Sequence, residues 1–88
     1  MAENGQKVVV QKKQDETAFF VEALTNKYNG QRQIQVNDTY LKDGELNYAR
    51  RGVNIDVIDI PAVIQAMAQL YEAEVGQPMI VTMGDPEL

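Results

Sequence analysis

Two tyrosines and five basic residues in the middle of the chain are the side chains best suited to binding an unpaired nucleic-acid strand. Such a strand offers charged phosphates and exposed base faces, so a protein that holds it needs cations and flat side chains on which bases can stack. Tyr28 and Tyr40 are the candidates for stacking. The candidates for phosphate contacts are Lys27, Arg32, Lys42, Arg50 and Arg51.

Amide side chains at alternating positions extend this set. Asn and Gln both donate and accept hydrogen bonds, so a face covered with them can meet phosphate, sugar or base edges. Gln35 and Asn47 are the amides that we expect to contact the strand. The other amides expected on the same face are Gln33, Asn37 and Asn54.

Each of these residues also has a simpler explanation. A tyrosine beside a turn or at the end of a strand is an ordinary residue of a β-sheet. Arg50 and Arg51 could serve only to keep an edge strand soluble, and the amide face could be a plain solvated surface. The residues alone leave both explanations open.

The residue types that most often carry out catalysis are absent from the chain. The sequence has no His, no Cys and no Ser, so general-base, thiolate and serine chemistry have no candidate. Asp56 and Asp59 lie three positions apart and could hold a divalent cation, but helix capping and solvation explain them more simply. We therefore predict a protein that is not an enzyme and that uses no cofactor and no metal.

Charge is divided along the chain. The 88 residues include 8 basic and 13 acidic side chains, which gives a net charge of −5. From Lys27 to Arg51 there are five basic and three acidic residues, whereas six acidic residues and no basic residue follow Gly52. We expect folding to gather the basic residues on one concave surface, and the acidic end to repel duplex DNA or to recruit a basic partner protein.

Length and composition predict one small intracellular domain that makes no contact with membranes. A chain of 88 residues buries a modest fraction of its surface, so pairing with a second copy would add core. Without cysteine it has no disulfide framework. Apolar runs such as Val8 to Val10 are too short to cross a bilayer, and the N-terminus lacks the apolar core of a signal peptide.

Turn residues and alternating polarity predict four strands. Asn29-Gly30 and Asp43-Gly44 favour tight turns because these residue types tolerate positive φ angles. Residues 1–16 are expected to form a flexible arm that could add a short edge strand. The expected strands cover residues 17–24, 32–41, 46–51 and 53–57.

A helix is expected after the last strand. Asp59 is a candidate N-cap, Pro61 is tolerated in the first turn, and the helix should run to about Glu74 before Gly76 ends it. Apolar residues recur on it at spacings of three and four, which predicts a stripe that packs on the sheet and against a second copy. The expected dimer interface consists of Val63, Met67, Leu70 and Tyr71.

These elements predict an α+β fold, a twisted four-stranded antiparallel sheet followed by one C-terminal helix, as a homodimer. The domain is expected to cover residues 17–76, between the arm at 1–16 and an acidic tail at 77–88 in which residues 79–83 could form a short strand.

One continuous segment resembles a known family. The run from Gly44 to Ile55, Gly-Glu-Leu-Asn-Tyr-Ala-Arg-Arg-Gly-Val-Asn-Ile, resembles the positive-cofactor-four family of transcriptional coactivators, whose pattern is Gly-Glu-apolar, a basic pair, Gly, and an alternating strand before a helix. Tyr28-Asn29-Gly30 and Ile34-Gln35-Val36 resemble the family's turn and second strand, and Tyr40 lies near its stacking aromatic.

The resemblance covers roughly residues 18–74 and implies a homodimer. In that dimer two curved sheets present polar grooves to unpaired DNA, and the helices pack together on the opposite side. The chain departs from the family at Asn29, Gln31 and Asn37, where members often carry basic residues, and its helix lacks the family's aromatic shortly after the proline. These departures predict a weaker electrostatic contribution.

We therefore predict non-catalytic, largely sequence-independent binding of single-stranded DNA by a homodimer, in support of transcription, replication or recombination. Binding of RNA stays open. The alternative is a small dimeric protein-interaction or inhibitor module that does not bind nucleic acid, which the net acidity of the chain favours.

Overall fold

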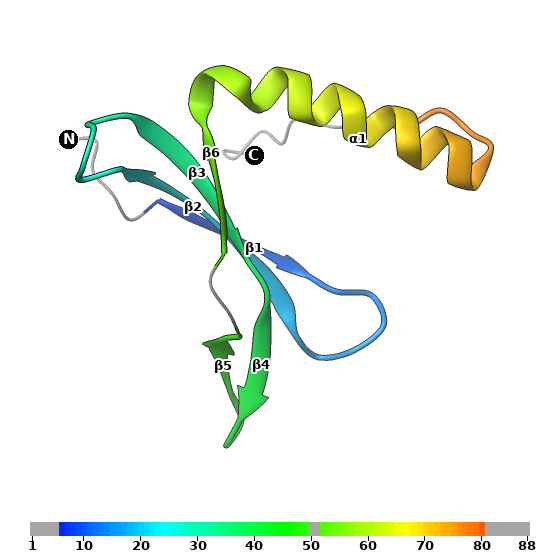
Figure 1. The fold of residues 1–88 in the computed structure, drawn as a ribbon. Helices are drawn as coiled ribbons and strands as arrows, with labels where there is room; N and C mark the ends of the chain where they lie inside the picture. Colours follow the sequence, from blue (N-terminus) through cyan, green and yellow to red (C-terminus); the bar gives the residue numbers. More distant parts are fainter. Residues whose placement is uncertain (1–5, 50–51, 81–88) are drawn as a thin grey trace, which may run out of the picture. The chain divides into compact units, whose positions relative to one another are not determined.

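The structure is a computed structural model that describes residues 6–49 and 52–80. The chain divides into two compact units, residues 1–58 and residues 59–88, and each is treated by itself. The first unit contains all the strands found in residues 6–49 and 52–80, and the second contains the helix α1 (Figure 1). The chain thus has the predicted α+β content.

The main sheet has four antiparallel strands in the order β1-β2-β3-β6. The prediction of a four-stranded antiparallel sheet is confirmed, but one member differs. The edge strand β1 comes from the predicted arm, whereas the strand expected at 46–51 pairs outside this sheet. The four strands are β1 (Lys7–Gln11), β2 (Ala18–Thr25), β3 (Arg32–Asn37) and β6 (Val53–Asp56).

A second, two-stranded sheet consists of β4 (Thr39–Lys42) and β5 (Glu45–Tyr48). The turn between them has φ angles of 55° at Asp43 and 80° at Gly44, as the Asp-Gly pair predicts. The strand expected at 32–41 is therefore two strands, divided at Asp38. Arg50 and Arg51, at the end of the strand expected at 46–51, lie outside the described residues.

The division at Asp38 is accompanied by contacts that Asp38 and Thr39 make with residues far away in the sequence. The Asp38 carboxylate accepts a hydrogen bond from the Thr39 backbone N–H at 2.8 Å and pairs with the Lys12 ammonium at 2.7 Å, and these contacts lower the pKa of Asp38. The buried Thr39 hydroxyl then takes the place of a backbone partner for Ala18. It accepts from the Ala18 N–H at 3.1 Å and donates to the Ala18 carbonyl at 2.6 Å.

The register of the main sheet separates an apolar face from a polar face. Side chains alternate along each strand, and directly paired residues share a face. Only Ala18 and Phe20 are buried apolar residues within the described part of the chain, so most of the apolar face remains accessible. The apolar face comprises Val8, Val10, Phe19, Val21, Ala23, Ile34, Val36, Val53 and Ile55.

The second unit contains one helix, α1 (Ile60–Val75), and a 3-10 turn, η1 (Val57–Asp59), precedes it. The predicted end at Gly76 is confirmed, because its φ of 79° is left-handed and its N–H donates to the Glu72 carbonyl. Asp59 is the N-cap residue, as predicted, but it does not cap the helix through its side chain. Asp59 has right-handed angles (φ −93°, ψ −7°), and its side chain makes no capping hydrogen bond.

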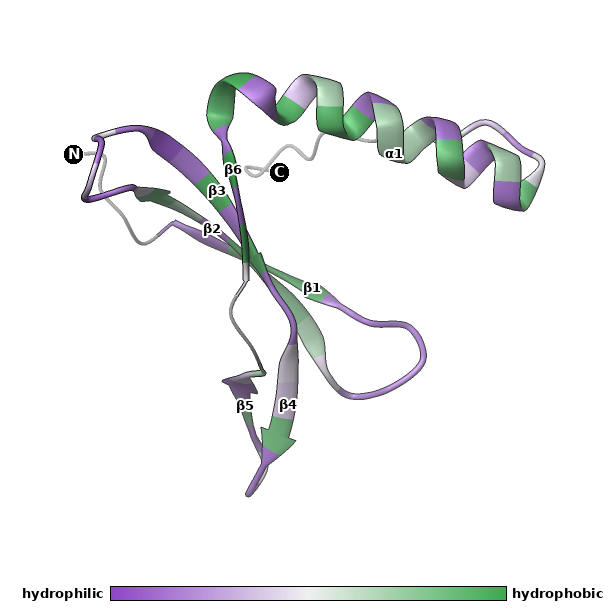
Figure 2. Cartoon of the chain, viewed as in Figure 1, coloured by the Kyte–Doolittle hydropathy of each residue, from purple (hydrophilic) through white to green (hydrophobic). Residues whose placement is uncertain are grey.

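Hydrophobic and hydrophilic residues alternate in bands along α1 (Figure 2). No residue of the helix is buried, and Met67 and Leu70 are among its most exposed apolar side chains. Met79 and Ile80 belong to no strand, and the rest of the strand expected at 79–83 lies outside the described residues. In the described ranges, no helix has the length and apolar character needed to span a membrane.

Replacement of Thr39 by Val should destabilise the fold. The two side chains have nearly the same shape, but valine leaves the buried N–H and carbonyl of Ala18 without their present partner. We expect a loss of about 1–3 kcal/mol in the free energy of unfolding, measured by urea denaturation. Thr39→Ser keeps the hydroxyl and should cost clearly less. Equal losses for the two variants would contradict the role given to the hydroxyl.

Candidate nucleic-acid interface

A row of four polar side chains crosses the polar face of the main sheet. The register pairs Lys7 with Glu22, Glu22 with Gln35, and Gln35 with Asn54, so one residue from each strand enters the row. The row therefore offers an ammonium, a carboxylate and two amides on the same face.

The amides of this face form a continuous hydrogen-bonded ladder between β3 and β6. Asn37 donates to Gln35, Gln35 donates to the Oδ1 of Asn54, and Gln33 donates to the Oδ1 of Asp56, each at 2.8 Å. Asn54 completes the ladder by donating to Gln33 at 3.2 Å. Asn37 is 3% exposed and Gln33 is 8% exposed. The expected amide face is therefore partly buried, and its side chains are engaged with one another.

The turn between β2 and β3 places Tyr28 beside this ladder. The Asn26 side chain accepts the N–H of Tyr28 at 2.8 Å, and Gly30 closes the turn with a φ of 75° and a hydrogen bond to the Asn26 carbonyl. The Tyr28 side chain is 87% exposed. The turn thus fixes the backbone of Tyr28 at the surface and leaves most of its side chain exposed.

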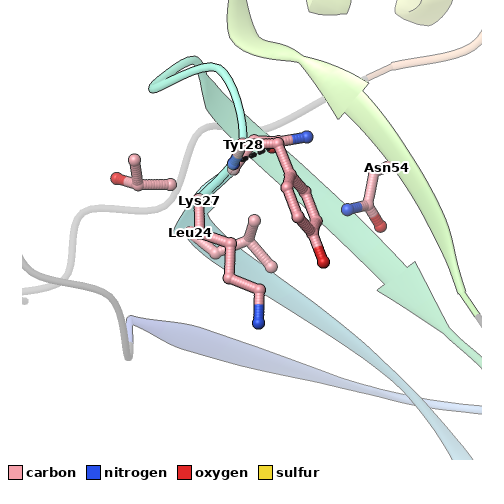
Figure 3. Close-up of a pocket in the computed structure, with 6 residues that line it drawn as sticks. Leu24, Lys27, Tyr28 and Asn54 are labelled. Atoms are coloured by element: carbon pink, nitrogen blue, oxygen red, sulfur yellow. Dashed lines mark hydrogen bonds between the residues drawn. The ribbon is translucent and has the colours of Figure 1, made fainter.

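A pocket of about 380 Å³ lies next to this ring. In Figure 3 the Tyr28 ring stands between Lys27 and Asn54, and the Lys27 ammonium lies 5.6 Å from the ring centroid. A cation, an aromatic ring and an amide therefore surround one opening. The residues that line the pocket are Leu24, Thr25, Asn26, Lys27, Tyr28 and Asn54.

A second aromatic cluster lies further along the polar face. The Tyr48 ring meets the edge of the Phe20 ring with centroids 5.2 Å apart, and the Lys7 ammonium lies 4.2 Å from the Phe20 centroid. The Tyr48 hydroxyl donates to the Glu22 carboxylate, with both oxygens at 3.0 Å. Desolvation and this interaction with Glu22 raise the pKa of Tyr48.

The structure brings together three of the predicted site residues, Lys27, Tyr28 and Gln35, on the polar face. Arg32 lies on the same face of β3 as the apolar residues, and its guanidinium donates to the Thr25 hydroxyl at 2.7 Å. Arg50 and Arg51 lie outside the described residues. The expected gathering of all the basic residues on one concave surface is not seen among the residues that the structure describes.

The other predicted residues form a separate group on the β4–β5 hairpin. Thr39 and Tyr48 are paired and point toward Ala18 and Phe20, so the next pair, Tyr40 and Asn47, lies on the opposite face of the hairpin. Lys42 shares that face and is paired with Glu45. These residues therefore do not line the same surface as Tyr28.

Sequence reasoning missed Lys7 and Tyr48 as members of the polar face. Lys7 belonged to the predicted arm, and Tyr48 had no special signal beyond its place in an expected strand. The sequence signal for Lys7 was the run of β-branched residues Val8, Val9 and Val10, which favours a β-strand. In a strand, Lys7 would lie on a defined face of the sheet.

Comparison of the chain with protein-family models, with curated proteins and with solved structures found no match.

Replacement of Tyr48 by Phe should lower stability in a pH-dependent way. At pH 7 we expect a loss of about 0.5–1.5 kcal/mol, because the hydroxyl no longer donates to Glu22. The folded state raises the Tyr48 pKa above the ordinary tyrosine value of about 10, so this stabilisation is full below pH 10 and is lost as pH rises through the folded pKa.

The measurement is urea unfolding of both proteins from neutral to strongly alkaline pH. The stability difference between them should be constant up to about pH 10 and should shrink above it. A difference that is constant or grows above that pH would contradict the proposed hydrogen bond. Subtracting the two curves removes the titration of the other tyrosines.

Proposed function

We propose that the protein binds single-stranded DNA, without catalysis and largely without regard to sequence, inside the cell and in support of transcription, replication or recombination. The observation that carries the proposal is the exposed Tyr28 ring beside the pocket, with the Lys27 ammonium on one side and the Asn54 amide on the other. This is the combination that stacks a base and neutralises a phosphate.

The described charges of the polar face balance, so a phosphate meets less repulsion there than the net charge of the chain suggests. Among the residues that the structure describes, Lys7 and Lys27 are the cations of this face. Its carboxylates, Glu22 and Asp56, each accept a hydrogen bond, from Tyr48 and from Gln33 respectively. Two lysines give a modest attraction for phosphate, so stacking on Tyr28 must supply much of the affinity.

We infer that the protein acts as a homodimer, as the resemblance implies. Apolar surface is the support for this: the helix stripe contains no buried residue, and Val8 and Val53 on the apolar sheet face are 63% and 62% exposed. A monomeric protein seldom leaves this much contiguous apolar surface in water. The same surface also favours the alternative function, a protein-interaction module, and the DNA titration distinguishes the two.

The first test is a fluorescence anisotropy titration of the whole protein with labelled oligo-dT at several salt concentrations. We expect binding that weakens with salt, with a slope of log K against log salt near about −1.4, because two lysines face the strand. Absence of binding at low salt would refute the proposed function and favour the interaction module.

The same titration should separate the two tyrosines. Tyr28→Ala should weaken binding by about 1–3 kcal/mol, roughly 5- to 150-fold, because a base loses its stacking surface. Tyr28→Phe keeps an aromatic ring and should keep most of the affinity. Tyr40→Ala serves as the control on the other face of the hairpin, and an effect as large as that of Tyr28→Ala would show that the strand follows a different surface.

The dimer can be tested on the helix. Leu70→Glu introduces a charge into the stripe formed by Val63, Met67, Leu70 and Tyr71, so it should convert the dimer to a monomer in sedimentation velocity. Gln69→Glu adds the same charge outside the stripe and should leave the dimer intact. A wild-type protein that sediments as a monomer at micromolar concentration would contradict the inferred assembly.

A further inference from the structure

The hydrogen bonds of the amide ladder all point in one direction along the polar face. Starting from Asn37, each amide nitrogen donates to the oxygen of the next side chain, through Gln35, Asn54 and Gln33, until the last bond reaches Asp56. An amide is nearly symmetric in shape, so the shapes of these side chains do not select one direction over the other. Something at one end of the ladder has to select it.

Asp56 is the group that can do this. An ionised carboxylate only accepts hydrogen bonds, so Gln33 has to turn its NH2 toward Asp56 and its carbonyl toward Asn54. Asn54 then has to donate to Gln33 and accept from Gln35, and the same constraint passes on to Asn37. We propose that Asp56 is a positioning residue that fixes the orientation of the whole ladder and, through it, the amide that Asn54 presents to the Tyr28 pocket.

The fixed orientation has a consequence for the ligand. In Figure 3 the amide nitrogen of Asn54 is on the side of the amide that faces the Tyr28 ring. One of its N–H groups binds Gln33, which leaves the second for a ligand in the pocket. The Lys27 ammonium is also a donor. Donors therefore surround the opening, and they fit bases that carry a carbonyl acceptor where other bases carry an amino group.

This inference rests on the proposed function, because it concerns which bases the Tyr28 pocket accepts. Thymine and cytosine are a suitable pair for a comparison, since both are single-ring bases of similar size. Apart from the 5-methyl group and N3 proton of thymine, they differ along the hydrogen-bonding edge at position 4. Thymine has a carbonyl acceptor there, and cytosine has an amino donor. Cytosine would set its amino group against the Asn54 N–H and the ammonium. The ladder therefore predicts a modest preference for thymine within otherwise sequence-tolerant binding.

The experiment compares oligo-dT with oligo-dC by anisotropy for the whole protein and three variants. The wild type should bind oligo-dT about 3- to 10-fold more tightly, the value of one hydrogen bond. Asp56→Asn can donate as well as accept, so both ladder directions become possible and the ratio should fall toward one. Asp56→Glu keeps an acceptor without a donor and should retain the preference.

A matched control accounts for the charge that Asp56→Asn removes. Asp43→Asn removes the same charge in the exposed β4–β5 turn, where asparagine is equally suited to a positive φ angle. It should leave the dT to dC ratio at the wild-type value, although both variants gain general affinity for phosphate. Loss of the ratio in Asp43→Asn, or its retention in Asp56→Asn, would overturn the proposal.

A second measurement tests the ladder without DNA. In 15N NMR spectra the side-chain NH2 groups of Asn37, Gln33, Gln35 and Asn54 should each give one set of signals in the wild type. In Asp56→Asn we expect shifts or doubled signals as far along the ladder as Gln35 and Asn37. Changes confined to Gln33 would show that Asp56 does not control the direction.

The titration and the NMR comparison together distinguish failure of the proposed function from failure of the proposed role of Asp56. A wild type that binds neither oligonucleotide refutes the proposed function, and the NMR comparison then still decides whether Asp56 orients the ladder. A wild type that binds both equally keeps the proposed function but overturns the role of the ladder in choosing bases.

Discussion

Strand β3 imposes the constraint on which the first unit depends. Its alternate residues are amides on one side, Gln33, Gln35 and Asn37, and aliphatic side chains on the other. Two of these amides are buried, and a buried amide without a partner is costly, so the neighbouring strand has to supply matching groups. Asn54 and Asp56 on β6 supply them, and the pairing of β6 with β3 follows from this requirement together with the contact of Ile34 with its partner Ile55.

Hydrogen bonding on one side of the sheet leaves little apolar core. Ala18 and Phe20 are the buried apolar residues of the described chain, and Phe20 is held by Tyr48 and Lys7 on the polar face. The stability of the isolated unit must therefore come largely from hydrogen bonds. These are the bonds of the amide ladder, the backbone bonds between strands, and side-chain bonds such as the one from the Thr39 hydroxyl to the Ala18 carbonyl. The opposite face, with its row of valines and isoleucines, supplies most of its hydrophobic stabilisation only when another apolar surface covers it.

Local patterns in the sequence were sufficient to predict the turns, the polarity of β3 and the extent of the helix. Asp43, Gly44 and Gly76 adopt the positive φ angles that their residue types favour. The alternation of polar and apolar residues from Gln33 to Asn37 predicts the two faces of β3 without information on the neighbouring strands. The site was predicted in part, because Lys27, Tyr28 and Gln35 belong to one turn and one strand. Their grouping depends on short-range geometry that the sequence encodes.

The features that the sequence could not reveal arise from contacts between distant residues. The break at Asp38 depends on Lys12 and Ala18, which precede it by about twenty positions or more, so alternation alone continues the strand through to residue 41. Tyr40 was grouped with Tyr28 because both are tyrosines of the basic central segment and because Tyr40 lies near the stacking aromatic of the family that the sequence resembles. In the structure Thr39 pairs with Tyr48, and this register places Tyr40 on the opposite face of the hairpin.

An acidic protein can bind an anion if the attraction is local and if the ligand offers more than charge. In the described part of the chain the polar face has two lysines and two carboxylates, so its local charge balances and it opposes phosphate less than the net charge of −5 suggests. A base stacked on Tyr28 contributes without regard to net charge, and this contribution is little screened by salt. Duplex DNA keeps its base faces stacked inside, so Tyr28 has no base face to stack on. The net negative charge opposes both forms, but only an unpaired base can gain stacking in return, so under the proposed function weak electrostatics combined with one exposed ring would favour the unpaired strand.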